Sequence, residues 1–109
     1  MGAEDFGTLD VLPELRRFKE ALSQRFRISK MILFGSRARG DHLRTSDVDL
    51  IIVSPDFQGI PFLQRIRAVV ELWDSDLALE VLPYTPEEFS RKAKEIGIVS
   101  QALREGLEI

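Results

Sequence analysis

The sequence predicts an α/β or α+β domain in which a small β-sheet packs against helices. Short apolar runs that stop at glycine or proline alternate with longer segments whose apolar residues recur every three or four positions. The chain has 109 residues, of which 44% are hydrophobic and 30% charged. This composition is typical of globular domains, and the length suits one of them. We therefore expect a single domain over residues 1–109.

The expected elements follow one another in this order: a helix over 13–25, a strand over 30–34, a polar loop over 36–45, a strand over 47–53, a helix over 63–73, a strand over 77–82, and helices over 86–95 and 98–104. In the first helix, leucines recur near helical spacing, and Pro13 suits the first turn because its missing N–H has no partner there. The strand over 30–34 is an apolar run that ends at Gly35.

The second strand is marked by alternation, because Val48 and Leu50 alternate with Asp47 and Asp49 before a fully apolar end. The loop before it is polar and has room for one helical turn. It contains His42, the single histidine, which we expect to be solvated.

The second half of the chain carries clear helix and strand signals. Four apolar residues recur at helical spacing in the helix over 63–73, namely Leu63, Ile66, Val70 and Trp73. Arg65 and Arg67 are expected on its solvated face. Pro83 is expected to end the third strand. The segment from Thr85 to Glu88 forms a capping box with proline at the first helical position. Gly97 and Gly106 bound the last helix.

Composition excludes several functional classes. A net charge of −3 and an isoelectric point near 5.2 argue against tight binding of nucleic acid. The absence of cysteine removes disulfides, thiolate nucleophiles and Cys-zinc sites. The longest apolar runs are far shorter than the ~20 residues of a membrane helix, and the N-terminus lacks a signal-peptide core. We therefore expect a cytoplasmic protein with no membrane partner.

Asp47 and Asp49 are the first candidate functional residues. Residues two apart on a strand point to the same face, so both carboxylates would project together from a strand otherwise built for burial. Mg²⁺ would relieve their repulsion, because it binds one or two carboxylates together with substrate phosphates and water. The alternative is structural: Asp47 lies at a frayed strand end and Asp49 faces solvent.

The turn after the strand over 30–34 is the second candidate site. Gly35 permits a sharp turn and close approach of the backbone to a ligand, and Ser36 adds a hydroxyl. Arg37 and Arg39 could neutralise the same phosphates. The alternative is an ordinary turn with two solvated arginines. A phosphate-binding turn followed by paired carboxylates is more specific than either part and indicates a nucleoside-triphosphate site.

The spacing of Gly35, Ser36, Asp47 and Asp49 resembles the signature of the DNA polymerase β-like nucleotidyltransferase superfamily. The Gly-Ser-Arg-Ala-Arg-Gly string and the segment from Leu82 to Phe89 resemble its minimal nucleotidyltransferases, and the resemblance covers roughly residues 15–89. It implies a small mixed sheet flanked by helices. It also implies a third carboxylate on a neighbouring strand.

Glu80 matches the position of that third carboxylate, where many relatives carry aspartate. It lies between apolar neighbours and should project away from the face of Leu77, Leu79 and Val81. Asp74 and Asp76 are rivals, but they precede the strand. Whether Glu80 ligates metal directly, acts through water or serves as a base stays open.

The resemblance implies an enzyme that uses ATP and two Mg²⁺ ions held by Asp47, Asp49 and Glu80. Relatives of this kind are commonly the antitoxin half of a pair with a helical HEPN toxin. The chain has no room for a second substrate domain, so a partner protein would present the hydroxyl that receives AMP. Two alternatives stay open: a non-catalytic antitoxin that covers its partner, and a standalone enzyme acting on a small molecule.

Overall fold

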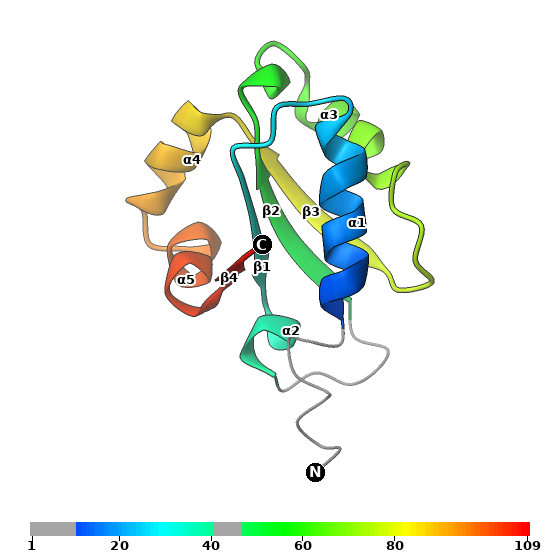
Figure 1. Cartoon of the computed structure of the whole chain (residues 1–109). Helices are drawn as coiled ribbons and strands as arrows, with labels where there is room; N and C mark the ends of the chain where they lie inside the picture. The colour runs from blue at the N-terminus through cyan, green and yellow to red at the C-terminus, as the bar shows by residue number, and fades with distance from the viewer. Residues whose placement is uncertain (1–10, 41–46) are drawn as a thin grey trace.

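The computed structural model describes residues 11–40 and 47–109, which form three layers with helices on both faces of a four-stranded sheet (Figure 1). In chain order the elements are α1 (Leu12–Ser23), β1 (Lys30–Phe34), α2 (Ser36–Arg39), β2 (Val48–Val53), the 3₁₀ turn η3 (Pro55–Phe57), α3 (Phe62–Val70), β3 (Leu79–Tyr84), α4 (Pro86–Ala93), α5 (Ile98–Glu105) and β4 (Leu107–Glu108). The predicted small sheet flanked by helices is confirmed. His42 and the second part of its loop lie outside the described residues.

The sheet is mixed, with the strand order β3-β2-β1-β4. β1 pairs antiparallel with β2 and with β4, whereas β2 and β3 run parallel. Because of these directions, the end of β1 and the starts of β2 and β3 meet at one end of the sheet. In this register Asp49 of β2 stands opposite Phe34 on one side and opposite Glu80 on the other.

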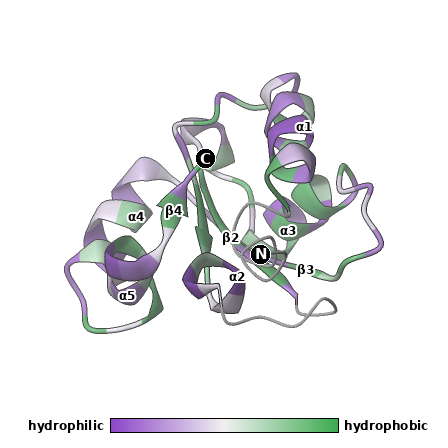
Figure 2. Ribbon diagram, turned by 60° about the horizontal axis from the view of Figure 1, so that its bottom comes forward, coloured by the Kyte–Doolittle hydropathy of each residue, from purple (hydrophilic) through white to green (hydrophobic). Residues whose placement is uncertain are grey.

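Each face of the sheet has its own apolar layer, and Figure 2 shows α1 and α3 on one side of the strands and α4 and α5 on the other. The first layer joins Leu15, Phe18 and Leu22 of α1 to alternate strand residues such as Leu50. The second layer joins the other set of strand residues to Phe89, Val99 and Ala102 of α4 and α5. Full burial of one such side chain contributes about 1.5–3 kcal/mol, so the central strands are held rigidly between the layers.

The third strand differs from the expectation, because it begins at Leu79 and continues through Pro83 to Tyr84. β3 is an edge strand, where proline is tolerated. The carbonyls of Ala78 and Tyr84 accept hydrogen bonds from the N–H groups of Val48 and Ser54, at the two ends of β2. Because the backbone groups of successive strand residues point to opposite sides, those of Pro83 face the open edge. The missing N–H of Pro83 therefore costs no bond to β2.

The expectation that Arg65 is solvated is wrong, because Arg65 is buried, with 7% of its surface exposed. Its guanidinium donates to the backbone carbonyls of Ile60 and Pro83 and pairs with Glu88 at 2.7 Å. Glu88 also completes the predicted capping box by accepting from the N–H of Thr85. Arg65 thus ties α3 to β3 and to the start of α4.

β4 is a further element that sequence patterning did not predict. It contains two residues, Leu107 and Glu108, directly after α5. Their backbone pairs with Ile32 and Leu33 of β1. A strand of two residues is too short to show an alternating pattern in the sequence. It forms because the chain that leaves α5 passes beside β1.

Candidate active site

The candidate site lies at the end of the sheet where β1 stops and where β2 and β3 begin. Asp49 and Glu80 are register partners on neighbouring parallel strands, so their side chains project from the same face. That face also carries α4 and α5, but Glu80 is exposed and Asp49 only partly buried. Two carboxylates are therefore held side by side on rigid strands at an accessible edge of the core.

The electrostatics of Asp49 reflect this pairing. The pKa of Asp49 is raised from 3.8 to about 6. Burial is the largest cause, followed by the negative charge of Glu80, that of Asp47 and a hydrogen bond shared with Glu80, while the positive charge of Arg39 lowers the pKa. The site thus concentrates negative charge that a cation would relieve.

Gly35 packs directly against this pair. Its φ angle is +76°, a conformation that L side chains rarely adopt. A Cβ atom at this position would collide with Oδ2 of Asp49. Glycine is therefore required both by the backbone conformation and by the carboxylate of Asp49. Close approach of this turn to a phosphate stays a prediction.

The residues after Gly35 form the single helical turn α2. Ser36 begins it, and the carbonyl of Gly35 accepts from the N–H groups of Ala38 and Arg39. The Nη1 atom of Arg39 lies 3.8 Å from Glu105 of α5. Because Arg39 also lowers the pKa of Asp49, its charge lies close enough to act on the carboxylate pair.

Arg37 is placed differently from the expectation, since it is only 1% exposed. The alternative of an ordinary turn with two solvated arginines is therefore wrong for Arg37. The contact of Arg37 with phosphate stays a prediction.

Asp47 lies one residue before β2 and is exposed. It is near enough for its charge to raise the pKa of Asp49. The rival carboxylates Asp74 and Asp76 are exposed in the turn before β3, and neither is the register partner of Asp49. The structure therefore brings Asp47, Asp49 and Glu80 to one end of the sheet.

The donor set suits Mg²⁺, because carboxylate oxygens are hard ligands and the negative charge of Glu80 acts on Asp49 across the β2–β3 pair. Within the described residues, 11–40 and 47–109, no group of three or more His, Cys, Asp or Glu is arranged so as to hold a metal ion. One or two carboxylates with substrate phosphates and water are a usual magnesium environment.

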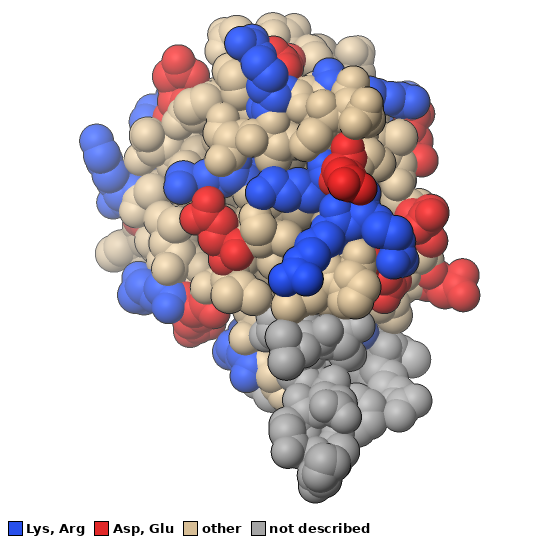
Figure 3. All heavy atoms as spheres, in the orientation of Figure 1, with Lys and Arg blue, Asp and Glu red and all other residues tan. Residues whose placement is uncertain are grey.

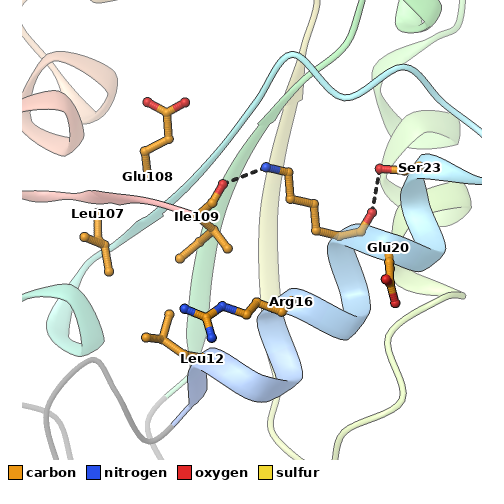
Figure 4. Close-up of a pocket in the computed structure, with 8 residues that line it drawn as sticks. Leu12, Arg16, Glu20, Ser23, Leu107, Glu108 and Ile109 are labelled. Carbon is orange, nitrogen blue, oxygen red and sulfur yellow. Dashed lines mark hydrogen bonds between the residues drawn. The ribbon is translucent and has the colours of Figure 1, made fainter.

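A hollow of about 190 Å³ beside Gly35 adds two residues that sequence analysis missed. Gln101 and Glu105 of α5 line it together with Gly35 and Arg39. No local pattern marks these residues, because they reach the site through the packing of α5 against β1. A larger hollow of about 610 Å³ lies between α1 and β4, where Lys19 donates to the carbonyl of Ile109 (Figure 4). None of the candidate site residues lines this larger hollow.

The mixed sheet, the Gly-Ser turn and the carboxylate pair at one end of the sheet are features of the nucleotidyltransferase class. Residues 15–104 match the family model described as a nucleotidyltransferase domain. This chain therefore belongs to the nucleotidyltransferase domain family, as the sequence resemblance predicted.

Individual relatives agree with this assignment. The chain is 31% identical over 91 residues to the protein adenylyltransferase MntA of Thermococcus cleftensis, covering 84% of each chain. It is 33% identical over 75 residues to a proposed protein adenylyltransferase of Methanocaldococcus jannaschii, covering 68% of this chain and 74% of the relative. A proposed nucleotidyltransferase from Sulfolobus solfataricus has a similar structure, with a TM-score of 0.65 and 25% identity over 84% of this chain and 80% of that one. The expectation of an enzyme of this class is confirmed.

Among the helices in the described part of the chain, none combines the length and apolar character needed to cross a membrane.

Proposed function

We propose that this protein transfers AMP from ATP to a hydroxyl group of a partner protein in a Mg²⁺-dependent reaction. The observation that carries the proposal is the pair Asp49 and Glu80, held in register on adjacent strands with Gly35 packed against it. Similarity to a named protein adenylyltransferase supports a protein as the acceptor. We also propose that the protein acts in the cytoplasm.

The roles of the residues follow from their positions. Asp47 and Asp49 would hold two Mg²⁺ ions together with the triphosphate, with Glu80 beside them. When bound, the metal ions would supply charge stabilisation for the leaving pyrophosphate. Gly35 and Ser36 would contact the β- and γ-phosphates through the turn, and Arg39 would add positive charge there.

In the proposed reaction, the acceptor hydroxyl oxygen forms a bond to the α-phosphorus of ATP. The bond between the α-phosphorus and the oxygen that joins it to the β-phosphate breaks, and pyrophosphate leaves. Glu80 is exposed at the start of an edge strand, so an incoming hydroxyl can reach its carboxylate. We assign Glu80 the task of accepting or orienting the hydroxyl proton, which is general-base work suited to a carboxylate beside the reacting oxygen.

The partner is proposed to be a HEPN-type toxin, so that this protein acts as the antitoxin of the pair. Support comes from the resemblance to minimal nucleotidyltransferases and from the site itself, which is open on the Glu80 side. A purely non-catalytic antitoxin is the main competitor. The aligned carboxylates favour the enzyme, because a binding module gains nothing from the repulsion that raises the pKa of Asp49. A standalone enzyme acting on a small molecule is the third possibility.

The test is AMP transfer to the purified protein encoded by the adjacent gene, in the presence of ATP and Mg²⁺. Intact-mass measurement should show one or more AMP units on that partner and none on this chain. Glu80→Gln should slow transfer far more than it weakens ATP binding. The proposal fails if the partner stays unmodified yet inhibited and if Asp47→Asn leaves that inhibition unchanged, because this pair of results defines a binding module.

A further inference from the structure

Three hollows adjoin one another on the face of the sheet that carries α4 and α5. The hollow beside Gly35 shares the wall residue Ile98 with a second hollow of about 250 Å³. The second hollow shares Leu82, Tyr84 and Lys92 with a third of about 430 Å³, which extends to Phe62. Together they form a run of hollows, here called the α4–α5 groove, that extends from Gly35 to the start of α3, and none of the three site carboxylates lines it.

The groove is aligned with the candidate site through β3. Glu80, Leu82 and Tyr84 alternate along this strand and therefore share one face. At about 3.3 Å per residue, Leu82 lies about 7 Å and Tyr84 about 13 Å along the strand from Glu80. An extended polypeptide has nearly the same rise per residue, so it could span this distance with about four residues.

The walls of the groove are apolar, with a basic end. Ile98 is 59% exposed and Phe62 38% exposed, although both are large hydrophobic residues. Arg91 and Lys92 of α4 line the end near Tyr84, with Nζ of Lys92 5.8 Å from the centre of the tyrosine ring.

Three acidic side chains line the groove, namely Glu88, Glu95 and Glu105, and Glu105 lies at the far end beside Arg39. The carboxylate of Glu88 is already paired with Arg65 at 2.7 Å. Glu95 lines the middle hollow together with Lys92, whereas Arg91 lines only the end hollow, where Glu95 is not among the wall residues. The groove thus suits an apolar side chain next to a carboxylate.

The open edge of β3 is less suited to docking than this face. An added strand would need the outward backbone groups of β3, yet Pro83 has no N–H and its carbonyl accepts from Arg65. A partner is therefore better held by side chains in the groove than by extension of the sheet.

We propose that the α4–α5 groove docks the polypeptide that carries the acceptor hydroxyl. The segment lies extended along β3, with its hydroxyl residue beside Glu80. An apolar side chain two to four residues away fills the groove over Leu82, and one or two carboxylates beyond it meet Arg91 and Lys92. This inference rests on the proposed function, because it assumes that the acceptor is a protein. It adds the kind of sequence around the acceptor hydroxyl: an apolar residue two to four positions away, followed by acidic residues.

The test uses synthetic fluorescent peptides that contain one tyrosine, a leucine three residues away and two glutamates beyond it, made in both chain directions. Matched peptides carry two lysines instead of the glutamates. Binding to the nucleotide-free protein is measured by fluorescence anisotropy. The glutamate peptide in one of the two directions should bind at least tenfold more tightly than its lysine counterpart.

Two pairs of variants locate the binding surface. Lys92→Glu should weaken binding of the glutamate peptide at least tenfold, whereas Lys94→Glu, the same charge change outside the groove, should leave it unchanged. Ile98→Asp should weaken it, whereas Ile96→Asp, at a residue fully exposed and outside the three hollows, should not. Equal binding of the glutamate and lysine peptides, or equal effects within either pair of variants, would overturn the proposal.

Binding and chemistry are separated by repeating the measurement with Asp49→Asn, which should bind the peptide but transfer no AMP. If the glutamate peptide binds through Lys92 but never receives AMP, docking stands and the proposed function fails. If AMP reaches glutamate and lysine peptides equally and Lys92→Glu has no effect, docking fails and the proposed function stands. Self-association that Ile98→Asp abolishes would instead make this groove a contact between two copies, which would also overturn the proposal.

Discussion

At the scale of single residues, the site depends on what surrounds each carboxylate rather than on the carboxylates alone. If β3 carried an apolar side chain in register with Asp49, the pKa of Asp49 would not be raised by a neighbouring negative charge on that strand. Glu80 occupies that place, and Gly35 closes the other side of the carboxylate. Burial, the negative charge of Glu80 and the close turn at Gly35 therefore all act on the carboxylate of Asp49. Such a combination is typical of functional sites.

The raised pKa of Asp49 predicts how stability depends on pH in the absence of metal. Because its pKa is raised from 3.8 to about 6, its contribution to stability is fully present below about pH 4 and is lost as pH rises through about 6. Asp49→Asn does not undergo this loss. We expect the variant to gain stability over the wild type between pH 4 and pH 7, by about 1–2 kcal/mol after allowance for solvent screening.

Urea unfolding of both proteins in EDTA from pH 4 to pH 8 measures this difference. Asp74→Asn provides the control, because it removes a carboxylate that is exposed before β3. A stability difference between wild type and Asp49→Asn that stays constant over the whole range would show that Asp49 has no raised pKa.

Gly35 supports a second prediction at this scale. Gly35→Ala should abolish nucleotide binding, because its Cβ would displace the carboxylate of Asp49 and because φ is +76°. Gly59→Ala is the matched control, since φ is +80° there and nothing lies within 4 Å of an added Cβ. Both variants should lose about 1 kcal/mol or more of stability from backbone strain, but only Gly35→Ala should lose binding of Mg²⁺-ATP. Equal binding by the two would leave Gly35 a turn residue without a role in the site.

At the scale of elements, the site depends on how strands and helices are joined. Antiparallel β1–β2 pairing and parallel β2–β3 pairing bring one strand end and two strand starts together. Arg65 fixes the neighbourhood of β3, since it bonds to Pro83 and pairs with Glu88 at the start of α4. The placement of Glu80 and of the α4–α5 groove thus relies on a buried cation in α3.

Removal of this cation should therefore destabilise the fold. Arg65→Leu is expected to lower the free energy of unfolding by about 2–3 kcal/mol, because two backbone carbonyls and one carboxylate lose their partner. Arg67→Leu, at an exposed position of the same helix, should change it by less than about 0.5 kcal/mol. Chemical denaturation of both variants measures the difference, and equal losses would mean that the contacts of Arg65 add nothing beyond an ordinary surface arginine.

The comparison of sequence and structure at this scale shows where local patterns stop being informative. The strand Lys30–Phe34 was predicted with its observed bounds, because an apolar run ending at Gly35 is a local signal. The continuation of β3 through Pro83 was not predicted, because a single sequence does not reveal that a strand lies at an edge. The burial of Arg65 was missed because its partner Glu88 is 23 residues away. The pairing of Asp49 with Glu80 likewise needs a register that only the folded sheet defines.

At the scale of the whole molecule, the face drawn in Figure 3 carries side chains of both charges. Figure 3 shows Lys and Arg side chains over α1 with Asp and Glu side chains among them, and the net charge is −3. That nucleic acid is not a direct partner stays a prediction from the net charge. Asp47 and Asp49 could be selected from the strand pattern and Glu80 through the family resemblance. Gln101 and Glu105 could not be selected, because α5 reaches the site through tertiary packing.

The central claim is that Asp49 and its neighbours form a site for a magnesium–nucleotide complex, and isothermal titration calorimetry with ATP tests it most directly. We predict that the wild-type protein binds ATP in the presence of Mg²⁺, that binding is lost in EDTA, and that Asp49→Asn weakens it at least tenfold. Asp74→Asn should bind as the wild type does, because its carboxylate lies outside the site. Equal affinity of the wild type and Asp49→Asn for ATP with Mg²⁺ would contradict the account.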